Sequence, residues 1–289
     1  MGTIEQVLIN GLILGANYAL IALGLTLIFA IMGVLNFAHG QMYVLGGFVA
    51  YYLYGVFRIH YLLALAASAV TVAAVGLVFE RLFFRRVLRV ATREESTMLL
   101  AAGTALLLDS LGLVVFGEKQ RGVPPVVPGV YRIAGAYVPA GRALIFLLAL
   151  GLAGAFLLFM QYTRPGRALR AIAQDREAAT LQGVDLHRYS ALGFAIGAAL
   201  AGVAGGLLVT VFAVNAGAGT PISIKAFIMI MIGGAGVVSG AILGAFVLGF
   251  SEAIGYFFIP GSITYLLILV GLIMFLLVRP QGIMGRPWG

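Results

Sequence analysis

The sequence predicts an all-α polytopic membrane protein of about eight to nine transmembrane helices, with broken or re-entrant segments and a cytoplasmic coupling helix. Of its 289 residues, 62% are hydrophobic and only 10% are charged, against roughly 25% in soluble domains. The apolar residues form runs of about the 20 residues that a membrane-spanning helix needs. An outer-membrane barrel would instead alternate apolar and polar residues. We therefore expect a single transmembrane domain over residues 1–289.

The first half of the chain contains four apolar runs, at about residues 7–33, 42–57, 62–79 and 98–116. No basic segment precedes the first run, so we expect a retained span and not a cleaved signal peptide. The polar sequence NFAHGQ separates the first run from the second. Five arginines between residues 80 and 95 place that loop in the cytoplasm, because positive residues stay inside.

The second half begins with a Pro-rich segment at 117–141, which we expect to be an external loop with a short hairpin at 130–138. Its apolar runs are 143–162, 191–214, 226–258 and 263–278. The run at 226–258 is too long for one span, and GGAGVVSG (233–240) interrupts it. We therefore expect a helix break there.

These runs place the N-terminus outside and the C-terminus in the cytoplasm. Loops assigned inside contain twelve of the 18 Lys and Arg residues, as the positive-inside rule requires. The six assigned outside include Lys225, which follows an expected outer loop at 215–224. If the run at 226–258 did not split into two segments, the number of membrane crossings would change by one. One terminus would then lie on the opposite side of the membrane.

The charged and reactive residues do not indicate an enzyme, a metal site or a nucleic-acid-binding protein. The net charge of +8 comes largely from arginines beside apolar runs. The chain has no cysteine, and His39, His60 and His187 lie in separate segments without metal-ligand spacing. Serine-nucleophile and zinc-protease motifs are absent. We expect no catalytic residue, no metal and no cofactor on this chain.

Small residues recur at four-residue spacing in two runs, and this spacing puts them on one helix face. One set is Gly236, Gly240 and Gly244, and the other is Gly193, Gly197, Ala201 and Gly205. Small residues let helix backbones approach closely. We expect both sets to pack against neighbouring helices.

Residues 34–53 and 234–253 form a candidate internal repeat, because each places a small-residue break before a Gly-interrupted apolar run. Paired interruptions in two halves of a transporter indicate a binding site, since unwound backbone inside a membrane must line protein or a water-filled cavity. Ordinary glycine-rich helix contacts would give the same pattern. The sequence leaves both interpretations open.

Two carboxylates, Asp109 and Glu252, fall inside predicted spans. A carboxylate there is costly, so it should face the bundle interior or a wet cavity and have a partner. A functional role and a structural pairing are both consistent with the sequence.

A polar, Arg-rich helical segment at 162–191 separates two apolar runs. Glu177, Ala178 and Ala179, followed by Gly183, have the spacing of the cytoplasmic loop by which ABC importer permeases engage their ATPases. Neither Lys119 nor Lys225 follows the Gly-rich run of a phosphate-binding loop, so this chain does not hydrolyse ATP itself. The alternative for the segment is an amphipathic helix on anionic lipid.

The surrounding sequence resembles the LivH-like permease subunits of branched-chain amino-acid ABC importers almost end to end. The matching pieces include INGLILGANYALIALGLTLIFAIMGVLNFAHGQ, TRPGRALRAIAQDREAATLQGVDLHRYSALGFAIGAALAGVAGGL, IKAFIMIMIGGAGVVSGAILGAFVLGFSEA and VRPQGIMG. Two positions depart from the pattern. Gln41 stands where such proteins commonly carry an acidic residue, and Asp109-Ser110 replaces a pair usually of amide type.

The resemblance implies a bacterial or archaeal plasma-membrane permease that lies in lipid and translocates branched-chain or related small amino acids. It implies a second, LivM-like permease subunit, two ATPase subunits that bind ATP and Mg, and an external solute-binding protein. Within segment 163–190 it assigns ATPase coupling to Arg164, Gly166, Arg170, Asp175, Glu177, Ala178, Ala179 and Gly183. The two breaks would flank the translocation path, with candidate residues Asn36, His39, Gln41, Tyr43, Gly233, Gly234 and Gly236.

Three alternatives stay open at this point. The permease could carry urea or short amides, it could be a self-contained secondary transporter that couples ions through Asp109 or Glu252, or it could be a structural membrane subunit.

Overall fold

The computed structural model describes residues 2–33, 35–84, 94–133 and 135–285. The first half contains α1 (Gly2–Met32), α2 (His39–Ala50), the π-helical turn η1 (Tyr51–Val56), α3 (Tyr61–Phe79), the π-helical turn η2 (Glu80–Phe84) and α5 (Glu94–Phe116). A two-stranded antiparallel hairpin follows, β1 (Val130–Ile133) and β2 (Ala136–Pro139). The hairpin predicted at 130–138 is therefore confirmed.

The second half is also helical. It contains α6 (Ala140–Tyr162), α7 (Arg164–Gln174), α8 (Arg176–Leu181), α9 (Leu186–Leu208), the 3-10 turn η3 (Ala216–Ala218), α10 (Gly219–Gly233), α11 (Val238–Phe258) and α12 (Gly261–Val278). Eight helices of the described chain are long and apolar enough to cross a membrane. This number confirms the predicted polytopic all-α fold, and the separation of α10 from α11 confirms the break predicted in the run 226–258.

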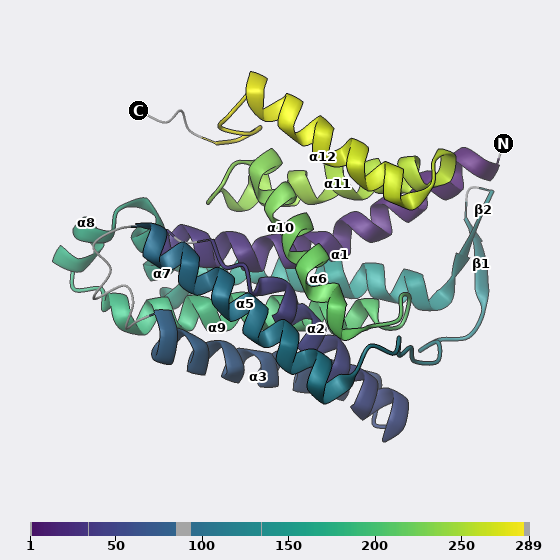
Figure 1. The fold of residues 1–289 in the computed structure, drawn as a ribbon, viewed down its shortest axis with the longest axis horizontal. Coiled ribbons are helices and arrows are strands. Elements are labelled where there is room, and N and C mark those ends of the chain that lie inside the picture. Colours follow the sequence, from purple (N-terminus) through teal and green to yellow (C-terminus); the bar gives the residue numbers. More distant parts are fainter. Residues whose placement is uncertain (1, 34, 85–93, 134, 286–289) are drawn as a thin grey trace.

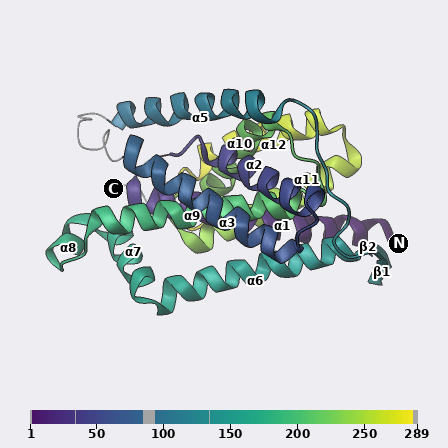
Figure 2. The ribbon, with the colours of Figure 1, turned by 90° about the horizontal axis from the view of Figure 1, so that it is seen from below.

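The long helices lie roughly side by side, and α1 and α9 form the centre of the bundle (Figures 1 and 2). In their most apolar windows, 83% of the residues of α1 and 72% of those of α9 are buried, against 11% in α5 and 6% in α12. The two outer helices therefore leave long apolar faces for lipid or for a partner subunit.

Glycines bring the central helices into backbone contact. A side chain added at Gly197 would overlap the carbonyl oxygen of Gly24 in α1, and one at Gly205 would overlap that of Tyr43 in α2. Gly244 packs in the same way on Met229 of α10. The predicted packing faces are therefore confirmed, except that Gly236 lies outside α11, in a turn with φ of +82°.

The N-terminus and the hairpin lie at one end of the bundle, and α7, α8 and the end of α12 lie at the other (Figures 1 and 2). The start of α1 and the end of α12 are thus on opposite sides. The predicted external loop and the predicted coupling loop are also on opposite sides, as the sequence requires.

The expected outer loop at 215–224 is wrong for most of its length, because helix α10 already begins at Gly219. Its glycine, threonine and proline occupy the first turn, where a proline costs no hydrogen bond of the helix. Lys225, which was assigned to the outside, lies within α10. The preceding span is also shifted, since α9 covers Leu186–Leu208 and not 191–214.

Candidate functional site

The polar break after α1 is a buried turn that starts α2 inside the bundle. Asn36 is fully buried, and its Oδ1 accepts a hydrogen bond of 3.1 Å from the amide of Ala38. His39, also fully buried, donates from Nε2 to the carbonyl of Ile21 at 3.0 Å. Unwound backbone is tolerated at membrane depth when protein surrounds it, and these contacts meet that condition.

The N-terminal ends of α2 and α10 meet at this break. The amide of Gly40 donates to Ser223 Oγ at 2.9 Å, and Ser223 Oγ donates to the carbonyl of Phe37 at 2.7 Å. Gly40 packs directly on the carbonyl oxygen of Gly219. Helix N-termini carry partial positive charge, so two of them together favour an anionic group nearby.

Gln41 extends this junction to α5. Its Nε2 donates to Asp109 Oδ1 at 2.7 Å, and its side chain packs against Gly219. The two positions that depart from the family pattern are therefore hydrogen-bond partners. Tyr43, the fourth candidate at this break, is also buried, and its backbone carbonyl lies against Gly205 of α9.

The second break lies at the opposite end of α10 and not beside the first. Gly234 and Gly236 adopt left-handed φ values of +108° and +82°. The break is closed by residues that follow α12, since the amide of Ile283 donates to the carbonyl of Ile232 at 2.8 Å and that of Met284 to Gly233 at 3.0 Å. The fifteen residues of α10 span roughly 20 Å, so the candidates Gly233, Gly234 and Gly236 do not join Asn36, His39 and Gln41 in one site.

The contact between Gly40 and Gly219 leaves no room for a methyl group. We expect Gly40→Ala to separate α2 from α10 and to lower the yield of folded protein, at a cost of about 1–3 kcal/mol or more for overpacking. Gly151→Ala in α6 is the matched control, because nothing lies within 4 Å of an added Cβ there. Thermal unfolding of the two purified variants in detergent measures the difference. Equal midpoints would show that the junction is looser than described.

Glu252 is paired with a residue that hydropathy assigned to a loop. Lys225 Nζ lies 2.7 Å from Glu252 Oε1, with the two side chains 16% and 1% exposed. Tyr18 of α1 completes the cluster, because its hydroxyl donates to Glu252 Oε2 at 2.7 Å and accepts from Lys225 Nζ at 3.0 Å. The expectation of a partner for this carboxylate is confirmed, and the cluster ties α1, α10 and α11 together.

The polar segment at 163–190 forms two short helices and not one. In α7, Leu169 and Ile172 are buried while Arg164, Arg167 and Arg170 are exposed. Thr163 caps the helix, with its Oγ1 accepting from the amide of Gly166 at 3.0 Å. Gly166 packs against the backbone of α6, which fixes α7 to the end of that span.

Asp175 ends α7 and begins α8, because its Oδ1 accepts from the amide of Ala178 at 2.9 Å. Glu177 and Ala178 are exposed, and Ala179 is buried. Leu181, which the sequence did not single out, is 86% exposed at the end of α8. The short helix therefore presents a carboxylate and a large apolar side chain away from the bundle.

Gly183 turns the chain from α8 to α9. Its φ of +82° is a left-handed conformation that favours glycine, as expected for this position. Asp185 then caps α9, and its hydrogen bond from the amide of Arg188 lowers the pKa of its carboxyl. A lowered pKa keeps the cap charged at neutral pH, and the cap is lost only as pH falls through that value.

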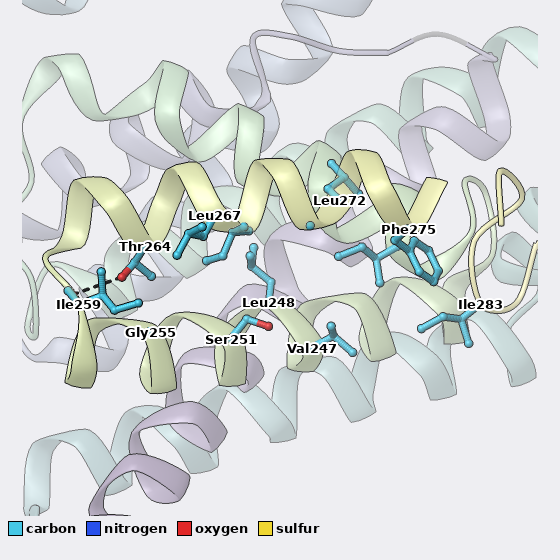
Figure 3. A pocket seen from close by; sticks show the side chains of 13 residues that line it. Val247, Leu248, Ser251, Gly255, Ile259, Thr264, Leu267, Leu272, Phe275 and Ile283 are labelled. Carbon is cyan, nitrogen blue, oxygen red and sulfur yellow. Dashed lines mark hydrogen bonds between the residues drawn. The ribbon is translucent and has the colours of Figure 1, made fainter. Parts of the chain in front are cut away.

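A cavity of about 400 Å³ lies between α11 and α12. Figure 3 shows apolar side chains such as Leu248, Leu267 and Phe275 projecting into it, with the hydroxyls of Ser251 and Thr264 among them. No charged group lines it within the described residues, so it offers no partner for a zwitterion. Among the described residues, no three His, Asp or Glu side chains gather as a metal site.

Comparisons with known proteins agree with the resemblance. The family model described as "Branched-chain amino acid transport system / permease component" matches residues 7–278. The high-affinity branched-chain amino acid transport permease protein BraD of Pseudomonas aeruginosa is 35% identical, over 98% of this chain and 96% of its own length. LivH of Escherichia coli K12 is 32% identical, over 98% of this chain and 96% of its own length. The probable LivH of Methanocaldococcus jannaschii is 30% identical, over 98% of this chain and 94% of its own length.

No solved structure matches the chain. The family match covers all eight candidate spans except the first few residues of α1, and it includes both helix breaks and the polar segment. The chain is therefore a member of the family of permease components of branched-chain amino-acid transport systems.

Proposed function

We propose that this chain is the transmembrane permease subunit of an ATP-driven importer of branched-chain amino acids in a bacterial or archaeal plasma membrane. The observation that carries the proposal is the pair α7 and α8, an exposed polar unit fixed between two spans of a chain without a phosphate-binding loop. Its partners are two ATPase subunits, which bind ATP and Mg, a second LivM-like permease subunit and an external solute-binding protein. The relatives are named for branched-chain amino acids, which favours this substrate over urea or short amides.

We infer the orientation from the arginines of α7 and α8. We place this end in the cytoplasm and the N-terminus with the hairpin outside. Lys225, one of the six positive residues assigned to the outside, lies within α10 and is paired with Glu252, so it does not count against the positive-inside bias.

The translocation path in this proposal passes the junction of α2 and α10 at Asn36, His39 and Gln41. Helix N-termini inside a membrane bind anionic parts of substrates in transporters built from broken helices. Glu252 already forms a buried ion pair with Lys225. This pairing argues against Glu252 as the ion-coupling residue of a secondary transporter.

The test is reconstitution of the complete complex in proteoliposomes with ATP on the ATPase side. We expect leucine uptake that requires ATP and the loaded binding protein, that stops with vanadate and that survives collapse of the proton gradient. Leucine transport by this chain alone in liposomes would contradict the proposal.

A further inference from the structure

We propose that Asp109 is the ammonium-binding residue of the translocation path, and that the α2 and α10 N-termini receive the carboxylate end of the amino acid. This inference rests on the proposed function. It names which chemical group of the substrate meets which side of the junction.

Asp109 lies well inside the candidate span Leu99–Phe116, and no basic side chain of the described residues pairs with it. Asp109 accepts a hydrogen bond of 2.7 Å from Gln41, which is a neutral amide. A carboxylate can accept about four hydrogen bonds, so most of its capacity stays open. Glu252 provides the contrast, because Lys225 and Tyr18 satisfy it inside the bundle.

The position of Asp109 leaves its side chain accessible to a substrate. Its side chain is half-buried, whereas Gln41 is only 6% exposed. Helix α5 lies at the edge of the bundle (Figure 2), so Asp109 stands between the buried junction and the exposed side of the molecule. A carboxylate held at membrane depth without a cation is expensive and indicates a functional partner. The cation that an amino-acid permease brings to it is the substrate's ammonium group.

An unused hydrogen-bond donor lies at the other side of the junction. Asn36 Nδ2 is buried without a partner in the described structure, although the Oδ1 of the same amide caps the turn. Because His39 donates from Nε2 to the carbonyl of Ile21, its Nδ1 is an acceptor and adds no donor. Together with the two helix N-termini, the Asn36 amide forms an environment for the substrate carboxylate. The junction thus offers opposite polarities to the two ends of a zwitterion.

Substitutions of Gln41 and Asp109 can separate the effect of the negative charge from the effect of the hydrogen bond between them. Asp109→Asn keeps the size and an oxygen that can accept from Gln41, but it removes the negative charge. The double variant Gln41→Glu with Asp109→Asn restores one carboxylate and one amide across the same contact. Gln41→Leu keeps the charge of Asp109 and removes only the hydrogen bond.

The experiment measures leucine uptake and ATPase activity of the complete complex in proteoliposomes, with assembly checked by size-exclusion chromatography. We expect Asp109→Asn to lower uptake roughly tenfold to a hundredfold, the effect of losing a charge-assisted bond, with ATPase activity retained. We expect the double variant to recover most of the uptake and Gln41→Leu to lose less than Asp109→Asn.

Wild-type uptake by Asp109→Asn in an assembled complex would overturn the ammonium assignment. A double variant as inactive as Asp109→Asn would also overturn it. Absence of ATP-driven leucine uptake in the wild-type complex is a different result, because it would overturn the proposed function itself.

Discussion

Leu181→Ala should lower ATP-driven uptake by roughly tenfold or more while the protein still inserts and folds. Leu181 is 86% exposed on α8, so its removal disturbs no core packing. This prediction treats Leu181 as a hot-spot residue of the ATPase interface, and truncation of such a residue costs at least about 2 kcal/mol. The measurement is uptake per ATP hydrolysed by the complete complex. Leu147→Ala in α6 is the matched control, since that leucine is 64% exposed within a membrane span.

Two further substitutions probe the same surface. Glu177 is exposed in the first turn of α8. Glu177→Lys should leave folding intact, because substitutions of exposed residues rarely change stability. It should instead weaken the contact with the ATPase subunit and so uncouple ATP hydrolysis from uptake. Gly183→Val should act through the backbone, because valine at a φ of +82° is strained. If these variants keep normal coupling and change only the dependence on anionic lipid, α7 and α8 lie on the membrane surface instead.

Lys225→Met should destabilise the protein by about 3–5 kcal/mol, because it leaves a buried carboxylate without its cation. Glu252 is 1% exposed and is tied to both Lys225 and Tyr18. Unfolding of the purified protein by denaturant in detergent measures the change. The double variant Lys225→Met with Glu252→Gln should recover most of the loss, because the charge is then absent from both sides.

The exposed pair Asp185 and Arg188 is the control for this prediction. Its atoms are 3.0 Å apart, but the side chains are 46% and 87% exposed, and solvent screens such pairs strongly. Arg188→Ala should leave the unfolding midpoint unchanged. A Lys225→Met variant as stable as the wild type would show that the buried cluster is not structural.

The helical architecture was predictable because hydropathy depends on the chain's local composition. Seven of the eight apolar runs contain the candidate spans of the described residues, whereas the run at 42–57 forms α2 and η1 and contains none. The local sequences NFAHGQ and GGAGVVSG mark both breaks. The Gly183 turn was also predictable, since a glycine after a short helix favours a left-handed end. The coupling and path roles of these residues stay predictions.

The partners of the polar side chains were not predictable, because they are set by which helices become neighbours. Gln41 and Asp109 are 68 positions apart, and Tyr18 and Glu252 are 234 apart. Lys225 looked like a loop residue because glycines, a threonine and a proline precede it. Those residues form the first turn of α10, and Glu252 neutralises the lysine within the bundle.

The closure of the second break also has a consequence for biosynthesis. The last carbonyls of α10, at Ile232 and Gly233, find their donors in Ile283 and Met284, about fifty residues further along the chain. At about 5–20 residues per second, a ribosome needs roughly 3–10 seconds to make that stretch. During that interval the carbonyls of Ile232 and Gly233 lack these hydrogen-bond donors. The inserting chain must therefore keep this half of the bundle open, or shielded by other proteins or lipid, until α12 has been delivered.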